Sequence, residues 1–424
     1  MGSRGATSHE HGTVAQALVT RYWLVLPRCY VETVVIHQRP VLSVPAYRAR
    51  VVDLAFPTDL RRRPLSRCLG RVLGEPVHAL VDVPGFDNSA MDGFALRHDG
   101  TGQLPVVGVV PAGAAPTTLA DGCATRIMTG APVPHGANTV VAFEDAQVDG
   151  DHLVVPSALP PGQHVRRRGE DVTVGDLVLP AGRTLRASDL AAAAAVGHHA
   201  LAVRRRPRVA VVTTGDETRP AGESLAPGQV HDSNSTFLHA AVRRAGARVM
   251  AIHHCPDRRK ALTRLFDELS VRADLLLVAG GISAGDYDIV RDVLESFVVH
   301  VTLKPGKPQA AGTWQGTPVI ALPGNPVSVA ASFAMFVRPW IDHALARPTP
   351  VRTAQAAEPW TSRPGITHLF PVTVTTTDGT HLATPHVSAS HRVASLAKAD
   401  AWAVVPEHLT EVAAGTTLDL LDLP

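Results

Sequence analysis

The chain has 424 residues with 40 basic and 38 acidic side chains, so its formal net charge is +2 at pH 7. That near balance excludes a protein whose overall field recruits nucleic acid or a membrane surface. The 45% hydrophobic content supplies core material for two to four domains, and it excludes a wholly disordered or collagen-like chain. Glycine and proline number 34 each, which indicates many turns and short strands.

The N-terminal residues 1–43 have no clean hydrophobic period, and we expect an extension, disordered or wrongly included at the translation start. Their apolar stretch, residues 22–26, lies between two arginines and is too short for a membrane span or a signal core. The four cysteines have no paired spacing typical of a metal site or a redox motif. These features predict a reduced protein in the cytoplasm.

Composition then changes in blocks along the chain. Residues 44–77 show helical spacing, the Val-rich block 78–166 alternates with Pro/Gly turns, and helical signal returns before residue 206. We therefore predict a helical or linker domain formed by 44–77 and 167–206, with a β domain inserted at 78–166. The apolar positions that suggest helix in the first half are Tyr47, Val51, Leu54, Leu65, Leu69 and Val72.

Strands and helices alternate across residues 207–348. The expected strands are 209–213, 249–253, 275–279 and 319–322, separated by helices at 235–245, 258–269, 289–296 and 327–340. This alternation predicts an α/β domain with a parallel sheet covered on both faces and a ligand site beyond the carboxyl ends of its strands. Residues 349–424 return to strand signals, and we predict a C-terminal β domain with a hairpin at Asp378-Gly379.

Three loops leave carboxyl ends of the expected parallel strands, at 213–217, 280–288 and 322–328. Their glycines let the backbone approach an anion, and the following helices begin with free N–H groups. Ser283 and Ser328 add hydroxyl donors, and the carboxylates Glu217, Asp286 and Asp288 are ligands suited to Mg²⁺. Each loop alone fits an ordinary strand–helix turn. Three at one sheet edge favour a phosphate or nucleotide site.

Lysine is scarce, with only four among the 40 basic residues, and two of these are three positions apart. Lys304 and Lys307 belong to the sequence Lys-Pro-Gly-Lys-Pro, whose prolines stiffen the turn. Two cations held together repel, so an oxyanion is a natural partner. The alternative is a solvated surface pair.

The block 78–166 and its border contain three polar clusters, at 87–94, 126–130 and 166–171. The first places Asp87 and Asp92 in a polar turn, and the last sets three arginines against two acids. By spacing alone these clusters fit a turn and a surface ion-pair group of small energetic value.

Seven motifs together carry a resemblance to a known family. In this order along the chain they resemble the molybdopterin molybdenumtransferases of the MoeA family, which includes the gephyrin E domain: 87–95, 126–134, 166–171, 214–217, 280–288, 304–308 and 322–328. The likeness runs from about Pro45 to the C-terminus. It implies a multidomain α/β fold of the molybdopterin-binding type and a homodimer whose active site is shared between subunits. It also implies insertion of molybdate into adenylylated molybdopterin, with Mg²⁺-dependent release of AMP.

The resemblance also assigns expected roles to residues of this chain. Asp92, Thr129 and Asp171 would reach toward the partner subunit, Glu217 and Asp288 would hold the metal, and Lys304 and Lys307 would bind the anion. Expected positions for binding the pterin substrate or molybdate are Gly280, Gly281, Ser283, Gly285, Gly324, Asn325, Ser328, Ser390 and Arg392. This chain departs from the family pattern at His300, which is often basic in relatives, and at Ile366 and Pro371, where relatives commonly have arginines.

Other functions fit parts of the same pattern. The loops 280–288 and 322–328 are also similar to those of molybdopterin adenylyltransferases, although the remaining motifs argue against that activity. A non-catalytic scaffold is a second alternative, and a paralogue with reduced activity or another oxyanion preference is a third. Expected protein partners are a molybdopterin adenylyltransferase or apo-molybdoenzymes.

Overall fold

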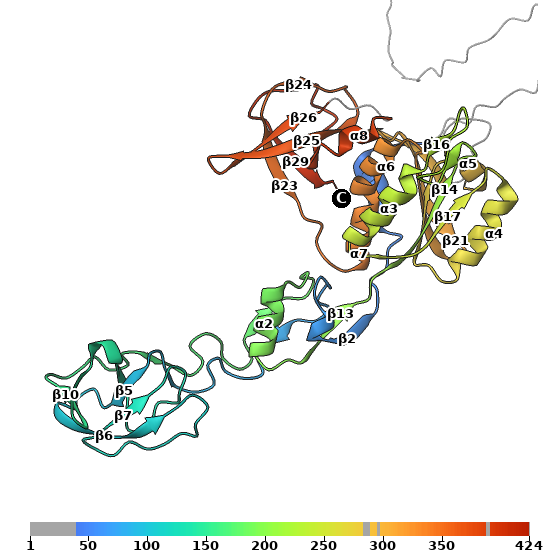
Figure 1. Cartoon of the computed structure of the whole chain (residues 1–424). Coiled ribbons are helices and arrows are strands. Elements are labelled where there is room, and N and C mark those ends of the chain that lie inside the picture. The colour runs from blue at the N-terminus through green and yellow to red at the C-terminus, as the bar shows by residue number, and fades with distance from the viewer. Residues whose placement is uncertain (1–39, 283–288, 295–296, 387–390, 424) are drawn as a thin grey trace, which may run out of the picture. The chain divides into compact units, whose positions relative to one another are not determined.

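A mixed seven-stranded sheet forms the centre of the α/β domain in the computed structural model, which describes residues 40–282, 289–294, 297–386 and 391–423 (Figure 1). The strand order is β1-β19-β21-β22-β18-β14-β17, and only β21 runs antiparallel to its neighbours in this sheet. The strands are β1 (Val41–Leu42), β14 (Arg208–Thr214), β17 (Arg248–Cys255), β18 (Leu275–Ala279), β19 (Val298–Val301), β21 (Pro308–Trp314) and β22 (Thr317–Leu322). The predicted α/β class is confirmed, whereas sequence periodicity missed β19 and the antiparallel β21.

Helices cover both faces of this sheet because successive strand residues point to opposite sides. Val209 and Val211 of β14 join one core, and Ala210 and Val212 join the other. The first face is covered by α1 (Val44–Val52), α3 (Ser233–Arg244), α6 (Pro326–Ser332), the π-helical segment Phe333–Val337 and α7 (Arg338–Ala344). The second face is covered by α4 (Arg259–Ser270) and α5 (Ile289–Val293).

The helix α1 differs from the sequence expectation in its place. Its sequence block predicts a place in the helical domain, but Tyr47 and Val51 are fully buried in the α/β core, and the Tyr47 ring meets Phe336 edge-on at 4.8 Å. The strand β1 just before it pairs with β19, so residues assigned to the N-terminal extension belong to the main sheet. The apolar pattern of α1 does not say which core it joins.

The small domain on either side of the insertion is built from short strand pairs and one helix. Strand β2 (Leu60–Pro64) pairs with β13 (Ala200–Arg204), β3 (Val77–His78) pairs with β12 (Leu177–Leu179), and α2 spans Ala187–Ala195. Their apolar side chains share a core of their own. The helix predicted from the spacing of Leu65, Leu69 and Val72 is wrong, because this stretch forms only a 3₁₀ turn, Leu65–Arg67, and irregular backbone.

The inserted β domain contains a six-stranded sheet in the order β8-β5-β7-β6-β10-β9. Its strands are β5 (Gly93–Leu96), β6 (Gly102–Val110), β7 (Ala124–Ile127), β8 (Thr139–Ala142), β9 (Gln147–Asp149) and β10 (His152–Val155). A separate pair, β4 (Asn88–Ser89) and β11 (Val165–Arg166), lies where the chain enters and leaves the insertion. Two apolar clusters lie on either side of this sheet.

A β barrel forms the C-terminal domain. Pairings close a ring in the order β25-β26-β23-β29-β27, and β20 (Leu303–Lys304) adds to β25 in parallel. The strands are β23 (Arg352–Ala356), β25 (Thr367–Thr377), β26 (Thr380–Pro385), β27 (Ala401–Val405) and β29 (Thr417–Asp422), with β24 (Trp360–Thr361) pairing β28 (Glu411–Val412) beside them and α8 at Val393–Leu396. The predicted Asp378-Gly379 hairpin is confirmed, and both residues have the positive φ that its turn requires.

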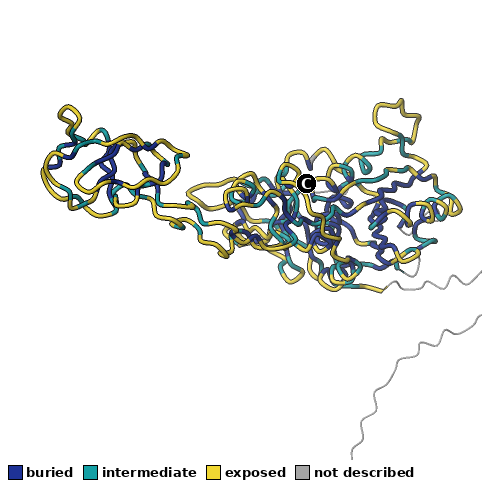
Figure 2. Tube along the Cα trace, turned by 90° about the horizontal axis from the view of Figure 1, so that it is seen from below, coloured by how far each residue is buried: buried dark blue, intermediate teal, exposed yellow. Residues whose placement is uncertain are grey.

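The buried residues of the chain belong to the cores of these domains. Figure 2 shows buried residues gathered in the interior of the domains and exposed residues along their outer turns. Cys68, Cys123 and Cys255 are free thiols. Among the helices of the described residues, none has the length and apolar character needed to cross a membrane.

Candidate active site

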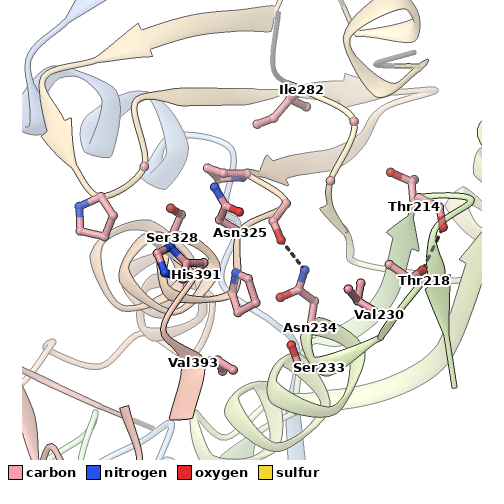
Figure 3. A pocket seen from close by; sticks show the side chains of 18 of the residues that line it. Thr214, Thr218, Val230, Ser233, Asn234, Ile282, Asn325, Ser328, His391 and Val393 are labelled. Carbon is pink, nitrogen blue, oxygen red and sulfur yellow. Dashed lines mark hydrogen bonds between the residues drawn. The ribbon is translucent and has the colours of Figure 1, made fainter. Parts of the chain in front are cut away.

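A cavity of about 1030 Å³ lies where the sheet strands β14, β18 and β22 end, the edge at which an α/β sheet binds its ligand. Its walls come from all three loops singled out in the sequence, from the start of α3, from the lysine turn and from the C-terminal domain. Figure 3 shows Thr214, Asn234, Ser328 and His391 around this one space, although their positions in the sequence are far apart. One further strand pair flanks it, formed by β15 (Thr218–Arg219) and β16 (Val230–His231).

Two of the loops lie so close together that one position accepts only glycine. Gly280 has φ +102°, and a Cβ there would lie 2.8 Å from the Thr214 hydroxyl oxygen and 3.0 Å from its carbonyl oxygen. A hydrogen bond from the Asn234 side-chain amide to the Gly324 carbonyl, 2.8 Å long, ties α3 to the third loop (Figure 3). The expected binding positions Gly280, Gly281, Gly324, Asn325 and Ser328 all line the cavity.

Hydrogen-bonding groups at this cavity are left for a ligand. The Thr214 hydroxyl and the Asn234 side-chain carbonyl oxygen are buried and have no hydrogen-bond partner among the described residues. The helix α3 begins at the cavity, capped by Asp232, whose carboxylate accepts from the Ser235 N–H at 2.9 Å and from the Thr213 hydroxyl at 2.8 Å. Free N–H groups at a helix start favour an anion.

The lysine turn forms another wall. Gly306 adopts φ +112°, and its carbonyl accepts a 2.9 Å hydrogen bond from the buried Gln309 side chain, which also donates to Ser332 at 2.6 Å. Lys304 is half-buried and Lys307 is exposed. Burial, together with the positive charge of Arg363, lowers the pKa of Lys304. In the described part of the chain neither ammonium group has an acidic partner, so both are free to bind an anion.

The C-terminal barrel contributes two histidines that the sequence patterns did not assign to a site. His368 lies opposite Lys304 in the β20–β25 register and lines the cavity, and so does His391. Burial, Lys304 and Arg363 lower the pKa of His368 to about 4. No pattern marks His368, because its place depends on a two-residue strand that joins two domains.

Carboxylates line the cavity next to the first loop. Glu217 is exposed there, and Asp257, which sequence reasoning missed, is half-buried nearby. The Asp216 N–H donates to the Asp257 carboxylate at 3.1 Å, and burial together with the negative charges of Asp216 and Glu217 raises the pKa of Asp257. The expected metal ligand Asp288 lies outside the described residues, as do Ser283, Gly285 and Ser390. Within the described ranges no cluster of three or more metal-ligating side chains occurs.

The expected residues of the β insertion do not line this cavity. Asp92 and Thr129 do meet: the Asp92 carboxylate accepts from the Thr129 N–H at 2.6 Å and from its hydroxyl at 2.8 Å, and these bonds lower the Asp92 pKa. Asp171 is exposed, and its N–H donates to the Val83 carbonyl at 3.0 Å. Arg392 is exposed between two cavity residues, His391 and Val393, but is not itself part of the lining.

The three residues that depart from the family pattern lie outside the cavity lining. His300 is on β19, outside the lining residues, and pairs in register with Val41. Pro371 lies on β25 opposite Trp402, and Ile366 directly precedes that strand. Positive charge reaches the cavity from Lys304, Lys307 and the neighbouring Arg363.

Comparisons with known proteins agree with this geometry. Three family descriptions match successive parts of the chain: "MoeA N-terminal region (domain I and II)" at residues 42–197, "Probable molybdopterin binding domain" at 210–343, and "MoeA C-terminal region (domain IV)" at 353–423. The second covers the domain that contains the cavity. The fold and site thus define a multidomain protein built around a molybdopterin-binding type of α/β domain.

Whole-length relatives narrow this class. Molybdopterin molybdenumtransferase 2 of Mycobacterium tuberculosis is 40% identical over 382 residues, covering 85% of this chain and 94% of the relative. The molybdopterin molybdenumtransferase of Synechococcus elongatus is 35% identical over 393 residues, covering 87% and 96%. The crystal structure of a molybdopterin biosynthesis MoeA protein from Pyrococcus horikosii superposes with a TM-score of 0.78 at 29% identity, covering 91% of this chain and 99% of that one. The chain belongs to the molybdopterin molybdenumtransferase family, the MoeA transferases.

Proposed function

We propose that this chain inserts molybdate into adenylylated molybdopterin, with release of AMP, in the cytoplasm. The observation that carries the proposal is a cavity at the ligand edge of the sheet. Among the described residues it presents two lysines without an acidic partner, two buried polar groups without a hydrogen-bond partner, and three carboxylates. The family membership and the relatives' names support the same reaction.

The lysine wall suits the molybdate substrate. Molybdate is a compact dianion, and ammonium groups on a stiff turn bind such an ion as point charges. Partial burial of Lys304 strengthens this attraction, because a buried pair of opposite charges is screened less by water. The neutral His368 beside it can donate or accept a hydrogen bond without adding charge. We propose that Lys304 and Lys307 hold the oxyanion next to the pterin.

The carboxylates carry negative charge, unlike the lysine turn, and therefore suit a divalent cation. Glu217 and Asp257 supply oxygen ligands of the kind Mg²⁺ prefers, and Asp288 is a third expected ligand. When bound, Mg²⁺ neutralises charge on the phosphates whose linkage breaks. Burial, and after it the negative charges of Asp216 and Glu217, raise the pKa of Asp257, and a cation bound beside these oxygens would offset that charge.

The remaining residues of the cavity orient the adenylylated substrate. The N–H groups at the start of α3 and the Ser328 hydroxyl can donate hydrogen bonds to phosphate oxygens, whereas the unpaired Asn234 side-chain carbonyl oxygen can accept one from a donor group of the substrate. The reaction then depends on positioning and charge neutralisation rather than on a nucleophilic side chain. We further propose a homodimer in which Asp92, Thr129 and Asp171 complete the cavity of the partner subunit, since they are placed away from the cavity lining of their own chain.

Molybdate-dependent AMP release from adenylylated molybdopterin tests the proposal. The double variant K304Q/K307Q should lose at least about 100-fold in rate, because each charge-assisted contact contributes about 1.5–3 kcal/mol. The chain offers a matched control, since K260Q/K398Q removes its other two lysines, both exposed, with the same change in charge. The control should retain the wild-type rate. A wild-type rate in K304Q/K307Q, or adenylylation of the pterin from ATP instead of AMP release, would overturn the assignment.

A further inference from the structure

A second cavity, of about 580 Å³, lies at the opposite end of the same sheet. Arg208 and Arg248, the first residues of β14 and β17, line it, whereas Thr214 at the far end of β14 lines the candidate active site. Among the described residues thirteen line it, and nine of these are arginines. We call it the arginine cavity, and neither the family resemblance nor the proposed reaction uses it.

Strand register explains how the chain gathers these arginines. In β2, Arg61 and Arg63 are two positions apart and therefore point to the same side, into the cavity, whereas Arg62 between them does not line it. The partner strand β13 ends at Arg204, and the following residues Arg205 and Arg206 continue along the same wall. Sequence distance separates β2 from β13, so only the pairing of these two strands brings the clusters together.

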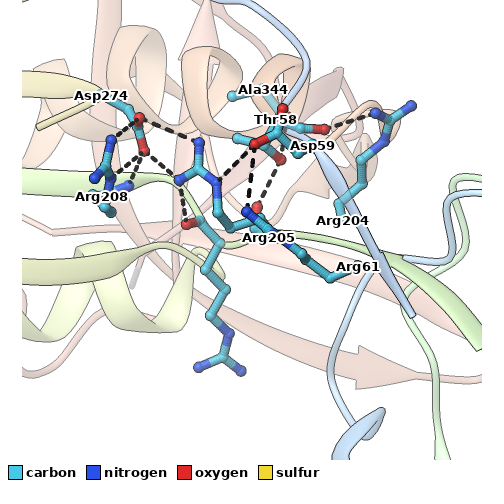
Figure 4. Close-up of polar contacts among 9 residues, drawn as sticks. Thr58, Asp59, Arg61, Arg204, Arg205, Arg208, Asp274 and Ala344 are labelled. Carbon is cyan, nitrogen blue, oxygen red and sulfur yellow. Dashed lines mark hydrogen bonds and ion pairs between the residues drawn. The ribbon is translucent and has the colours of Figure 1, made fainter. Parts of the chain in front are cut away.

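Acidic groups neutralise a small part of this charge. Figure 4 shows Arg205 between Asp59 and Asp274, with nitrogen–oxygen distances of 3.7 Å and 2.6 Å. Asp274 also pairs with Arg208 at 3.1 Å, and Asp59 with Arg61 at 3.9 Å. Within the described ranges the remaining arginines of the cavity have no acidic partner; these are Arg63, Arg71, Arg204, Arg206, Arg243 and Arg248. None of the described residues that line the cavity is acidic.

Two guanidinium groups are also left short of hydrogen bonds. The Nε atoms of Arg204 and Arg206 are buried and have no partner among the described residues. A buried N–H without an acceptor costs free energy, and an anion in the cavity would remove that cost. Burial, and after it the positive charges of Arg206 and Arg63, lower the pKa of Arg71.

The size and chemistry of the cavity indicate the class of ligand. A volume of about 580 Å³ falls within the range of small-molecule sites, and a concave wall suits a compact ligand better than a flat nucleic-acid backbone. Guanidinium groups bind phosphate oxygens through two parallel hydrogen bonds. We propose that the arginine cavity binds a small anion with two or more linked phosphate groups, either a nucleotide or an inorganic polyphosphate.

Calorimetric titration of the full-length chain with inorganic tripolyphosphate tests this proposal. All proteins carry K304Q/K307Q, so that the lysine turn does not contribute to the binding measured. R63Q/R243Q removes two exposed arginines of the cavity, and R62Q/R244Q is its matched control on the same strand and the same helix, outside the lining. The cavity variant should bind at least about tenfold more weakly, because a lost charge-assisted hydrogen bond exceeds about 1.4 kcal/mol. The control should change less than about twofold.

Further arms identify the source of the phosphate. ATP without metal and adenosine are titrated beside tripolyphosphate: binding of ATP and tripolyphosphate shows that the phosphate chain suffices, and binding of ATP alone shows a nucleotide site. Binding of an oligoglutamate peptide but of neither phosphate compound would overturn the proposal, as would equal weakening in both arginine variants. If R63Q/R243Q unfolds at a lower temperature than its control, the single exposed change R248Q replaces it. Because molybdate-dependent AMP release is measured separately with the lysines intact, failure of either proposal leaves the other standing.

Discussion

His368 connects the stability of the C-terminal barrel to the chemistry of the candidate site. Its side chain is 5% exposed, stacks against Phe370 with ring centroids 3.9 Å apart, and faces Lys304 across the β20–β25 pair. Burial, Lys304 and Arg363 lower its pKa from 6.5 to about 4. This difference in pKa corresponds to about 3 kcal/mol in favour of the neutral ring in the folded chain, because one pKa unit is worth about 1.4 kcal/mol.

Because the pKa of His368 differs between the folded and the unfolded chain, the free energy of unfolding depends on pH. The pKa of His368 is lower in the folded chain than in the unfolded chain, so the unfolded chain takes up the proton first as pH falls. The contribution is therefore fully present above about pH 6.5 and is lost as pH falls toward 4. Between pH 7.5 and 4.5 the loss from this one residue amounts to about 2.5 kcal/mol in the free energy of unfolding.

Urea unfolding of the wild type and of His368→Gln at the two pH values measures this loss. The variant can be less stable at both values, but its decrease between pH 7.5 and 4.5 should be smaller than that of the wild type by about 2.5 kcal/mol. An equal decrease in the two proteins would refute the reasoning. The imidazole signal that disappears in the variant identifies His368 in NMR titrations, where a pKa near 6.5 would refute it as well.

Lys304 offers a second check on the same group. Removing its charge with K304Q should raise the pKa of His368, whereas K398Q, an exposed lysine of the same domain, should leave it unchanged. Under the proposed function, molybdate bound at Lys304 should raise this pKa too, because a nearby anion favours the imidazolium form. No movement of the pKa in K304Q would contradict the placement of Lys304 beside the ring.

Two further predictions concern the inserted β domain. In Gly93→Ala the new Cβ would lie 1.8 Å from the Val141 carbonyl oxygen, so the β5–β8 pairing should be destabilised by about 3 kcal/mol and proteases should cleave this domain earlier. In the control Gly85→Ala the nearest contact of the new Cβ is 3.8 Å away, so this variant should resist proteases as well as the wild type does. Equal resistance of the two variants would contradict the reasoning. If Asp92 completes the partner subunit's site, mixing inactive D92N with inactive K304Q/K307Q should restore about a quarter of the wild-type AMP release, since half of the dimers are mixed and each has one intact site. No recovery in dimers shown to exchange subunits would contradict a shared site.

The sequence by itself determined the α/β class, the three glycine loops and the lysine turn. Strand–helix alternation over 207–348 fixes a mostly parallel sheet, and a parallel sheet brings carboxyl ends to one edge, so Glu217, Gly280 and Ser328 were predictable neighbours. The scarcity of lysine pointed to Lys304 and Lys307. The glycine loops and the lysine turn were predictable because each is a local sequence motif, which can be recognised without knowing what packs against it.

Only the tertiary structure decided the parts that depend on contacts between distant segments. Helical spacing in 44–52 could not show that α1 packs in the α/β core, because an apolar stripe does not name its partner. Asp257 and His368 enter the site through a neighbouring strand end and a two-residue strand pair, and neither has a local signal. The arginine cavity arises in the same way, because pairing of β2 with β13 assembles charges that a nearly neutral composition conceals.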